Sequence, residues 1–62
     1  MLNAGTTIHT ADGSTVTVRR IGLEYDLETQ NARGETISTV RMSHDDLSAL
    51  ADEADELLGE AA

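Results

Sequence analysis

Cysteine, tryptophan and phenylalanine are absent from this 62-residue sequence, which contains a single tyrosine. Without cysteine the chain can form no disulfide, and the two histidines, His9 and His44, are too widely separated to suggest a structural metal site. A domain of this length buries only about 60% of the surface that its unfolded chain exposes. We therefore expect a marginally stable protein, for which homodimerisation is the remaining common source of stability.

Long apolar runs are also missing. No stretch of eighteen apolar residues occurs, so the sequence predicts no transmembrane helix and no contact with a membrane. Residues 1–5 lack the basic and apolar regions of a signal peptide. These two absences favour a cytoplasmic protein.

Basic residues are absent from the last third of the chain. Residues 43–62 contain seven acids and no base, which gives this segment a charge of −7. Residues 1–42 contain five acids and four arginines, so they contribute only −1 of the total charge of −8. A field of one sign favours oppositely charged partners and opposes the approach of phosphate backbones or anionic lipids.

Two segments share one turn pattern. In residues 10–14 and in residues 31–35, a glycine follows two residues that tolerate a helical backbone: Gly13 in the first segment and Gly34 in the second. This pattern is typical of a three-residue hairpin loop, in which a type I turn is followed by a glycine in the left-handed conformation. The sequence therefore predicts two β-hairpins.

The alternation of side chains supports these hairpins. Loops centred on Asp12 and Arg33 place apolar residues opposite apolar residues, in the pairs Ile8 with Val16, Leu27 with Val40, and Tyr25 with Met42. One face of the sheet is then apolar, with Ile8, Val16, Val18, Leu23, Tyr25, Leu27, Val40 and Met42. We expect residues 20–22 to form a corner between the hairpins; the alternative is one long strand that bends at Gly22.

An amphipathic helix is expected to follow the last strand. Ser43 and Asp46 have the spacing of a capping box, and Gly59 is placed to end the helix. The apolar residues recur at steps of three and four and form one stripe: Leu47, Leu50, Ala51, Ala54, Leu57 and Leu58. The sequence thus predicts an α+β fold of one small domain over residues 1–62, in the order ββββα. A four-stranded antiparallel sheet (5–42) has one face covered by the C-terminal helix (43–59), and a short tail follows (60–62).

The outer face of this helix is the first candidate site. Its acids lack basic partners at four-residue spacing, and Asp52 with Glu56 is a like-charge pair that costs a few tenths of a kcal/mol. Two interpretations remain open: a solvated face that provides solubility or salt tolerance, and a surface that docks on a basic protein patch. In the second interpretation, the partner-binding residues are Asp45, Asp52, Glu53, Asp55, Glu56 and Glu60.

The sequence contains no recognisable catalytic or metal-binding motif. His9 and His44 have no second ligand at motif spacing, and no serine lies in a glycine-flanked nucleophile elbow. A chain of 62 residues also has little room for a pocket that excludes water. We therefore expect no enzyme activity, no metal and no cofactor.

The arginines are the second candidate site. Arg19 and Arg41 are expected on the outer sheet face, Arg20 at the corner and Arg33 at a hairpin tip. Up to three of these arginines could line a groove for nucleic acid along one edge of the sheet. Nucleic-acid binders usually add stacking aromatic residues, but Tyr25 is assigned to the apolar face. The alternative role is cross-strand pairing of Arg19 and Arg41 with the acids Glu24, Asp26 or Glu28.

Residues 40–47, in which a strand runs into a helix through a serine followed by acids, resemble the corresponding segment of PC4-type transcriptional coactivator domains. The similarity of pattern extends over residues 36–58. It implies the same topology and a homodimer, and membership would imply binding of single-stranded DNA. The chain departs from this family in having no lysine, no exposed aromatic residue and an acidic surface, so no binding residues are transferred.

Three hypotheses about function follow. The first is a small non-enzymatic regulator or inhibitor, of the type that phages and mobile elements encode, which docks its acidic helix on a basic surface of a partner protein. The second is a homodimeric nucleic-acid-binding module of coactivator shape that uses the four arginines. The third is a structural or assembly subunit. Exposure of Ile21 or Ile37 beside Leu2 would favour the third hypothesis, because both isoleucines depart from the apolar alternation; accommodation of both in bulges would remove this support.

Overall fold

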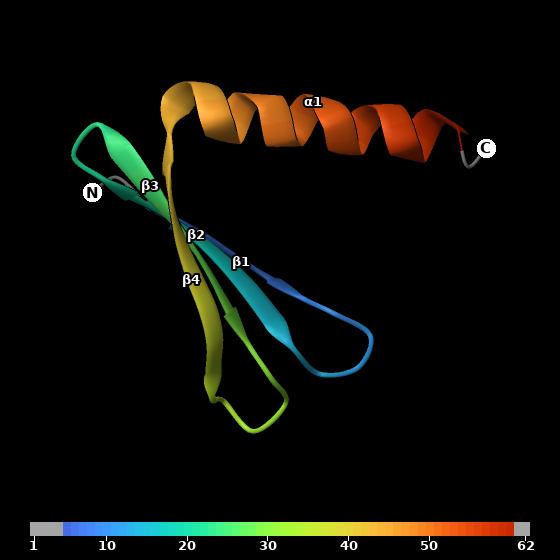
Figure 1. Cartoon of the computed structure of the whole chain (residues 1–62). Helices are drawn as coiled ribbons and strands as arrows, with labels where there is room; N and C mark the ends of the chain where they lie inside the picture. Colours follow the sequence, from blue (N-terminus) through green and yellow to red (C-terminus); the bar gives the residue numbers. More distant parts are fainter. Residues whose placement is uncertain (1–4, 61–62) are drawn as a thin grey trace.

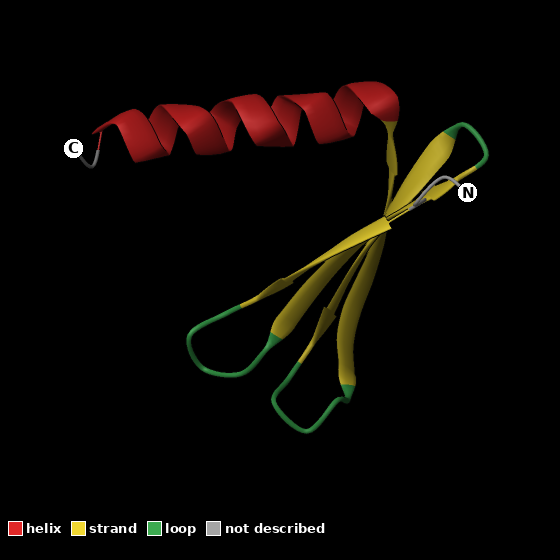
Figure 2. Cartoon of the chain, turned by 180° about the vertical axis from the view of Figure 1, so that it is seen from behind, coloured by secondary structure: helices red, strands yellow, loops and turns green. Residues whose placement is uncertain are grey.

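The computed structural model describes residues 5–60, which form one antiparallel sheet followed by one helix (Figures 1 and 2). The strands and the helix are β1 (Gly5–His9), β2 (Thr15–Ile21), β3 (Glu24–Gln30), β4 (Thr36–Ser43) and α1 (His44–Glu60). Each strand pairs with the next one along the chain, in the order β1-β2-β3-β4. The predicted α+β class and the ββββα order are confirmed.

Both three-residue loops form as expected. Gly13 and Gly34 have φ angles of 87° and 81°, the left-handed region that glycine adopts without steric cost. In the β1–β2 loop the amide of Thr10 donates to the carbonyl of Ser14 (2.9 Å). In the β3–β4 loop the amide of Asn31 donates in the same way to the carbonyl of Glu35 (3.0 Å).

A short polar side chain stabilises each loop. The Asp12 carboxylate accepts hydrogen bonds from the hydroxyl of Thr10 and from the amide of Ser14 (3.1 Å). In the second loop the side-chain oxygen of Asn31 accepts from the amides of Arg33 (2.9 Å) and Glu35 (3.1 Å). The bonds from Thr10 and then Ser14 lower the pKa of Asp12, because they favour its charged form.

The register of the outer hairpins agrees with the sequence. Ile8 pairs with Val16 in the first hairpin, and Leu27 with Val40 and Tyr25 with Met42 in the second. A register shift at the end of β3 leaves Ile37 as the extra residue of a bulge in β4, with 65% of its surface exposed. Ile21 lies opposite Glu24, at the end of β2.

The connection between β2 and β3 differs from the expected corner. Ile21 pairs with Glu24, so Gly22 and Leu23 form a two-residue turn, and the alternative of one long bent strand is wrong. Gly22 has a φ of 62° and Leu23 does not have a positive φ, which is the pattern of a type II′ hairpin. Leu23 is therefore a turn residue with 89% of its surface exposed, and its assignment to the apolar sheet face is wrong.

The helix begins with the predicted capping box. The amide of Asp46 donates to the Ser43 hydroxyl (3.1 Å), and the amide of Ser43 donates to the Asp46 carboxylate (3.2 Å). Gly59 was expected to end the helix, but it has no positive φ and lies within α1. The ring of His44 lies 6.5 Å from the ring of Tyr25, which places the first turn of α1 against β3.

The helix covers much less of the sheet than expected. Because β4 ends at Ser43 and α1 begins at His44, no loop residue allows the helix to turn back over the sheet. Figure 1 shows α1 diverging from the two hairpin loops, starting at the end of β4. In the helix only Leu47 is half-buried, and no residue among 5–60 is fully buried. The apolar core of this chain is therefore open.

The left-handed glycines provide a first test of this fold. We expect Gly34→Ala to lower the free energy of unfolding by about 1 kcal/mol or more, because a Cβ atom is disfavoured at positive φ. Gly59→Ala is the matched control, since Gly59 has no positive φ and its added Cβ would meet nothing within 4 Å. Urea unfolding followed by circular dichroism measures both variants. Equal effects of the two substitutions would contradict the turn assignment.

The lowered pKa of Asp12 provides a second test. A carboxyl whose folded pKa lies below its unfolded value contributes stability above the unfolded pKa, and this contribution disappears as the pH falls through the folded pKa. Asp12→Asn keeps the acceptor oxygen but removes the charge. We therefore expect the wild-type protein to be more stable than this variant at pH 7 and the difference to vanish well below about pH 4. A difference that persists in strong acid would contradict this role of the carboxylate.

Candidate protein interface

Charged side chains on the outer face of the sheet are already paired with one another. Arg41 contacts Asp26 (2.5 Å) and Glu24 (3.2 Å), and Arg19 contacts Glu28 (3.4 Å). These bonds, with Asp26 first, raise the pKa of the Arg41 guanidinium above its ordinary value. The predicted cross-strand pairing of Arg19 and Arg41 with the acids of β3 is confirmed, so these two arginines are not free for a ligand.

The other two arginines lie elsewhere. Arg20 alternates with Val18 and lies opposite Tyr25, which places it on the apolar face of the sheet rather than beside Arg19. Its Nε donates to the carbonyl of Gly22 (3.4 Å). Arg33 lies in the β3–β4 loop, where it contacts Glu35 (3.6 Å). The four arginines are therefore spread over both faces and one loop, and the half-buried Tyr25 offers no exposed ring beside them.

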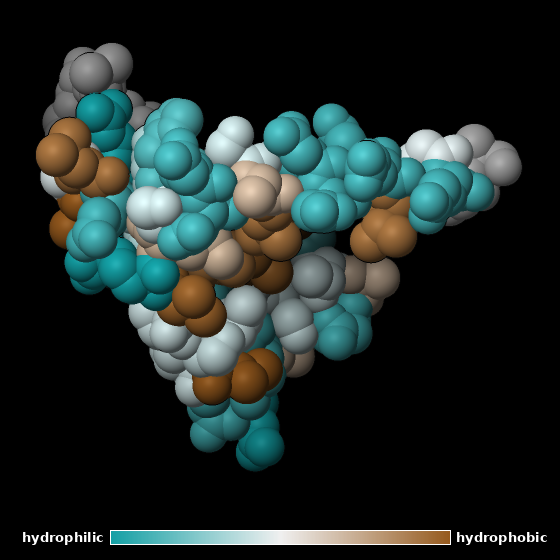
Figure 3. Space-filling model, turned by 45° about the horizontal axis from the view of Figure 1, so that its top comes forward, coloured by the Kyte–Doolittle hydropathy of each residue, from teal (hydrophilic) through white to brown (hydrophobic). Residues whose placement is uncertain are grey.

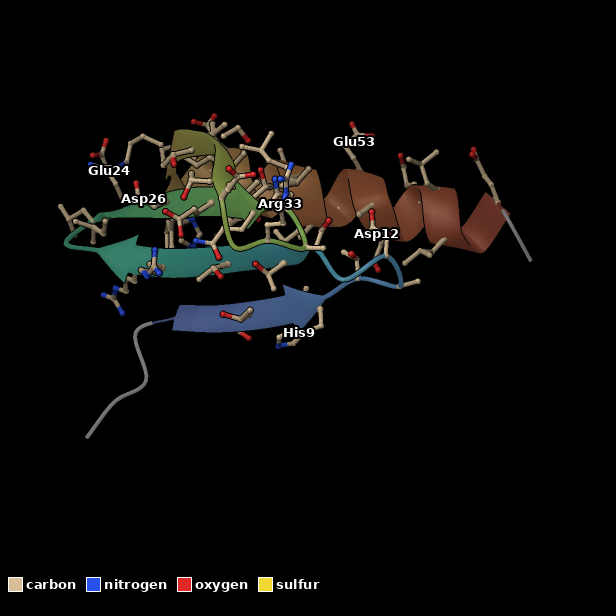
Figure 4. All side chains as sticks on the ribbon, turned by 90° about the horizontal axis from the view of Figure 1, so that it is seen from below. His9, Asp12, Glu24, Asp26, Arg33 and Glu53 are labelled. Atoms are coloured by element: carbon tan, nitrogen blue, oxygen red, sulfur yellow. The ribbon has the colours of Figure 1, made fainter. Side chains whose placement is uncertain are left out.

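The acids of α1 show a different pattern. Asp46 belongs to the capping box, and Asp45 lies 3.6 Å from Nδ1 of His44. Among residues 5–60, no base pairs with the acids further along the helix, and all of these are exposed: Asp52, Glu53, Asp55, Glu56 and Glu60. Figure 4 shows Glu53 on α1, well separated from Glu24 and Asp26 on β3. Unpaired negative charge in the described chain is thus concentrated on the helix.

The opposite side of the helix is an exposed apolar stripe. Leu50, Leu57 and Leu58 expose 43%, 66% and 71% of their surface. The sheet also exposes apolar residues on the face that carries Tyr25 and Met42, of which Ile8 and Val40 are the most accessible. In Figure 3 this apolar surface (brown) lies in the angle between α1 and the sheet, and hydrophilic surface (teal) follows the outer side of α1.

The histidines do not form a site with other groups. His9 ends β1 and His44 begins α1, and Figure 4 shows the labelled His9 at the margin of the sheet. Within the described part of the chain, no three side chains of histidine, aspartate or glutamate converge as metal ligands would. Over the same residues, no helix is both long and apolar enough to cross a bilayer.

The exposure of the two apolar faces was not predicted from the sequence. The helix stripe was expected to cover the sheet of the same chain, although the predicted strand and the predicted helix were contiguous at residues 42 and 43. That absence of a loop was the available signal, because a helix needs connecting residues to fold back over the strand that precedes it. Comparisons of the chain with protein-family models, with curated proteins and with solved structures found no match.

Proposed function

We propose that this protein is a cytoplasmic, non-enzymatic protein-binding module, a regulator or inhibitor that docks the acidic face of α1 on a basic surface of a partner protein. The observation that supports this proposal is the segregation of charge in the structure. Every acid of the described strands and hairpin loops has a hydrogen-bonding or ionic partner, but the five acids from Asp52 to Glu60 have none.

The acidic face has a cost for the isolated chain. Asp52 and Glu56 are one turn apart and repel each other, and acids near the C-terminal end of a helix oppose its dipole. A basic partner surface would reverse both effects, because its cations would pair with these carboxylates. Concentrated charge of one sign also accelerates the encounter with an oppositely charged protein.

The same distribution of charge argues against a phosphate backbone as the ligand. The chain has a net charge of −8, and three of its four arginines are held in ion pairs with carboxylates. Binding to nucleic acid depends on cations that displace counterions from phosphate groups. An arginine that already neutralises a carboxylate is a poor source of this free energy.

A charge-removing variant tests the proposal. The variant Asp52→Asn, Glu53→Gln, Asp55→Asn, Glu56→Gln keeps the size of each side chain and removes four negative charges. We expect a partner captured by the wild-type protein from a lysate of the source organism at low salt to bind the variant at least about tenfold more weakly. Four exposed ion pairs of a few tenths of a kcal/mol to 1 kcal/mol each supply that difference. Isothermal titration calorimetry with the purified partner measures it.

The matched control exchanges the acids with one another. The variant Asp52→Glu, Glu53→Asp, Asp55→Glu, Glu56→Asp keeps the charge and should retain binding. Binding by the wild-type protein should also weaken as salt rises, because exposed charge pairs are screened. Capture of no protein at low salt, or equal affinity of the charge-removing variant, would reject the proposal.

A further inference from the structure

Among residues 5–60, two apolar surfaces have no cover from the rest of the described chain, and they belong to different elements. One is the stripe of α1 that contains Leu50, Leu57 and Leu58. The other is the face of the sheet that contains Ile8 and Val40. In a compact α+β fold these two surfaces would pack on each other, because a helix stripe and a sheet face are complementary layers. Here they diverge from the end of β4, and each remains open to solvent (Figures 1 and 3).

The solvent-accessible surface and the radius of gyration show that the fold is more open than a compact domain of the same length. Its solvent-accessible surface is 4938 Å², whereas a compact protein of 6.6 kDa is expected to expose about 3,900 Å². Its radius of gyration is 12.9 Å, against about 10.6 Å for a compact domain of this length. Each chain therefore exposes about 1,000 Å² more than a closed fold would.

We propose that a second copy of this chain covers these surfaces, so that α1 of each copy lies on the apolar sheet face of the other around a two-fold axis. Each copy offers one helix stripe without a sheet and one sheet face without a helix. In a two-fold arrangement, each helix stripe covers the sheet face of the other copy, so no apolar surface is left over. A symmetric dimer requires this self-complementarity. Burial of this excess of about 1,000 Å² from each copy would give a total near 2,000 Å², the area at which obligate homodimer interfaces begin.

The distribution of charge favours packing of the helix on the sheet of the other copy over packing of the two helices on each other. The apolar sheet face carries one charged residue, Arg20, whose guanidinium contacts no carboxylate among residues 5–60. Apart from His44, every ionisable side chain of the helix is an acid. A sheet face with a positive charge therefore meets an acidic helix, whereas two helices side by side would oppose acid with acid. Two polar side chains of this sheet face are already suited to burial, since the hydroxyls of Thr29 and Ser38 bond to each other (2.8 Å).

The proposal concerns the apolar faces and does not depend on the proposed function. In this dimer the side of α1 opposite the apolar stripe, which carries Asp52 and Glu56, stays exposed and remains available to a basic partner. The two interactions also respond to salt in opposite directions. Docking on a basic protein weakens with salt, but two chains of charge −8 repel each other, so the dimer should strengthen as salt screens that repulsion.

Sedimentation equilibrium of the full chain is the first experiment. We expect a mass of twice 6.6 kDa at micromolar concentrations and a dissociation constant that falls as sodium chloride is raised. Dimers also unfold at a temperature that rises with protein concentration, and calorimetry at two concentrations measures this shift. A monomer of 6.6 kDa at all salt concentrations, up to about 100 μM protein, would overturn the proposal.

Substitutions then locate the interface. The double variant Leu57→Asp, Leu58→Asp adds charge to the end of the stripe, where both side chains are largely exposed in the single chain. We expect it to weaken the dimer by at least about tenfold, because two buried carboxylates would be left without partners. Leu23→Asp is the control, since Leu23 lies in the β2–β3 turn outside both apolar surfaces and should leave the dimer intact. Equal effects of the two changes would reject this interface.

Cross-linking distinguishes a dimer in which each helix lies on the other sheet from a dimer in which the two helices lie side by side. The chain has no cysteine, so a single introduced thiol reports on one position. Val40→Cys and Leu57→Cys proteins are mixed and treated with a short thiol cross-linker. We expect cross-links between the two variants in excess of those within either variant alone, because α1 of one copy faces the sheet of the other. Cross-links confined to the Leu57→Cys protein would show helices paired side by side and would overturn the proposed arrangement.

Discussion

The direct junction of β4 with α1 is the constraint on which the rest of this structure depends. Ser43 is the last residue of the strand, and it also caps the helix through its reciprocal hydrogen bonds with Asp46. Because the cap fixes the first turn of α1, the helix leaves the sheet in a direction that no loop residue can correct. The open angle, the exposed apolar stripe and the lack of a buried residue among 5–60 all follow from this junction.

Local features of the sequence predicted most of the sheet. Gly13 and Gly34 marked the two outer turns, and side-chain alternation gave the same registers, because a slip by one residue would turn every apolar side chain to the other face. Leu23 was misassigned for a related reason. Leu23 lies two residues before Tyr25 and so extends the alternation of β3 back into the turn, and the pattern alone did not separate a turn leucine from a strand leucine.

The candidate interface was only partly predictable. Pairing of Arg19 and Arg41 with the acids of β3 followed from alternation, because these residues share one face. The face of Arg20 depended on the β2–β3 turn and was missed with it. Amphipathic spacing showed which side of α1 is apolar, but it could not show what covers that side. That choice depends on the direction of the helix, which the cap at Ser43 sets.

Sheet edges offer another route of association, and the fold restricts it. Within residues 5–60, β1 spans five residues, and β4, at the other edge, carries the bulge at Ile37 and the ion-paired Arg41. Short strands, bulges and charge all hinder the pairing of one sheet edge with another. The net charge of −8 further opposes the open-ended assembly that exposed apolar surface would otherwise promote. The fold therefore favours contact through the faces of the sheet and helix over contact through the sheet edges.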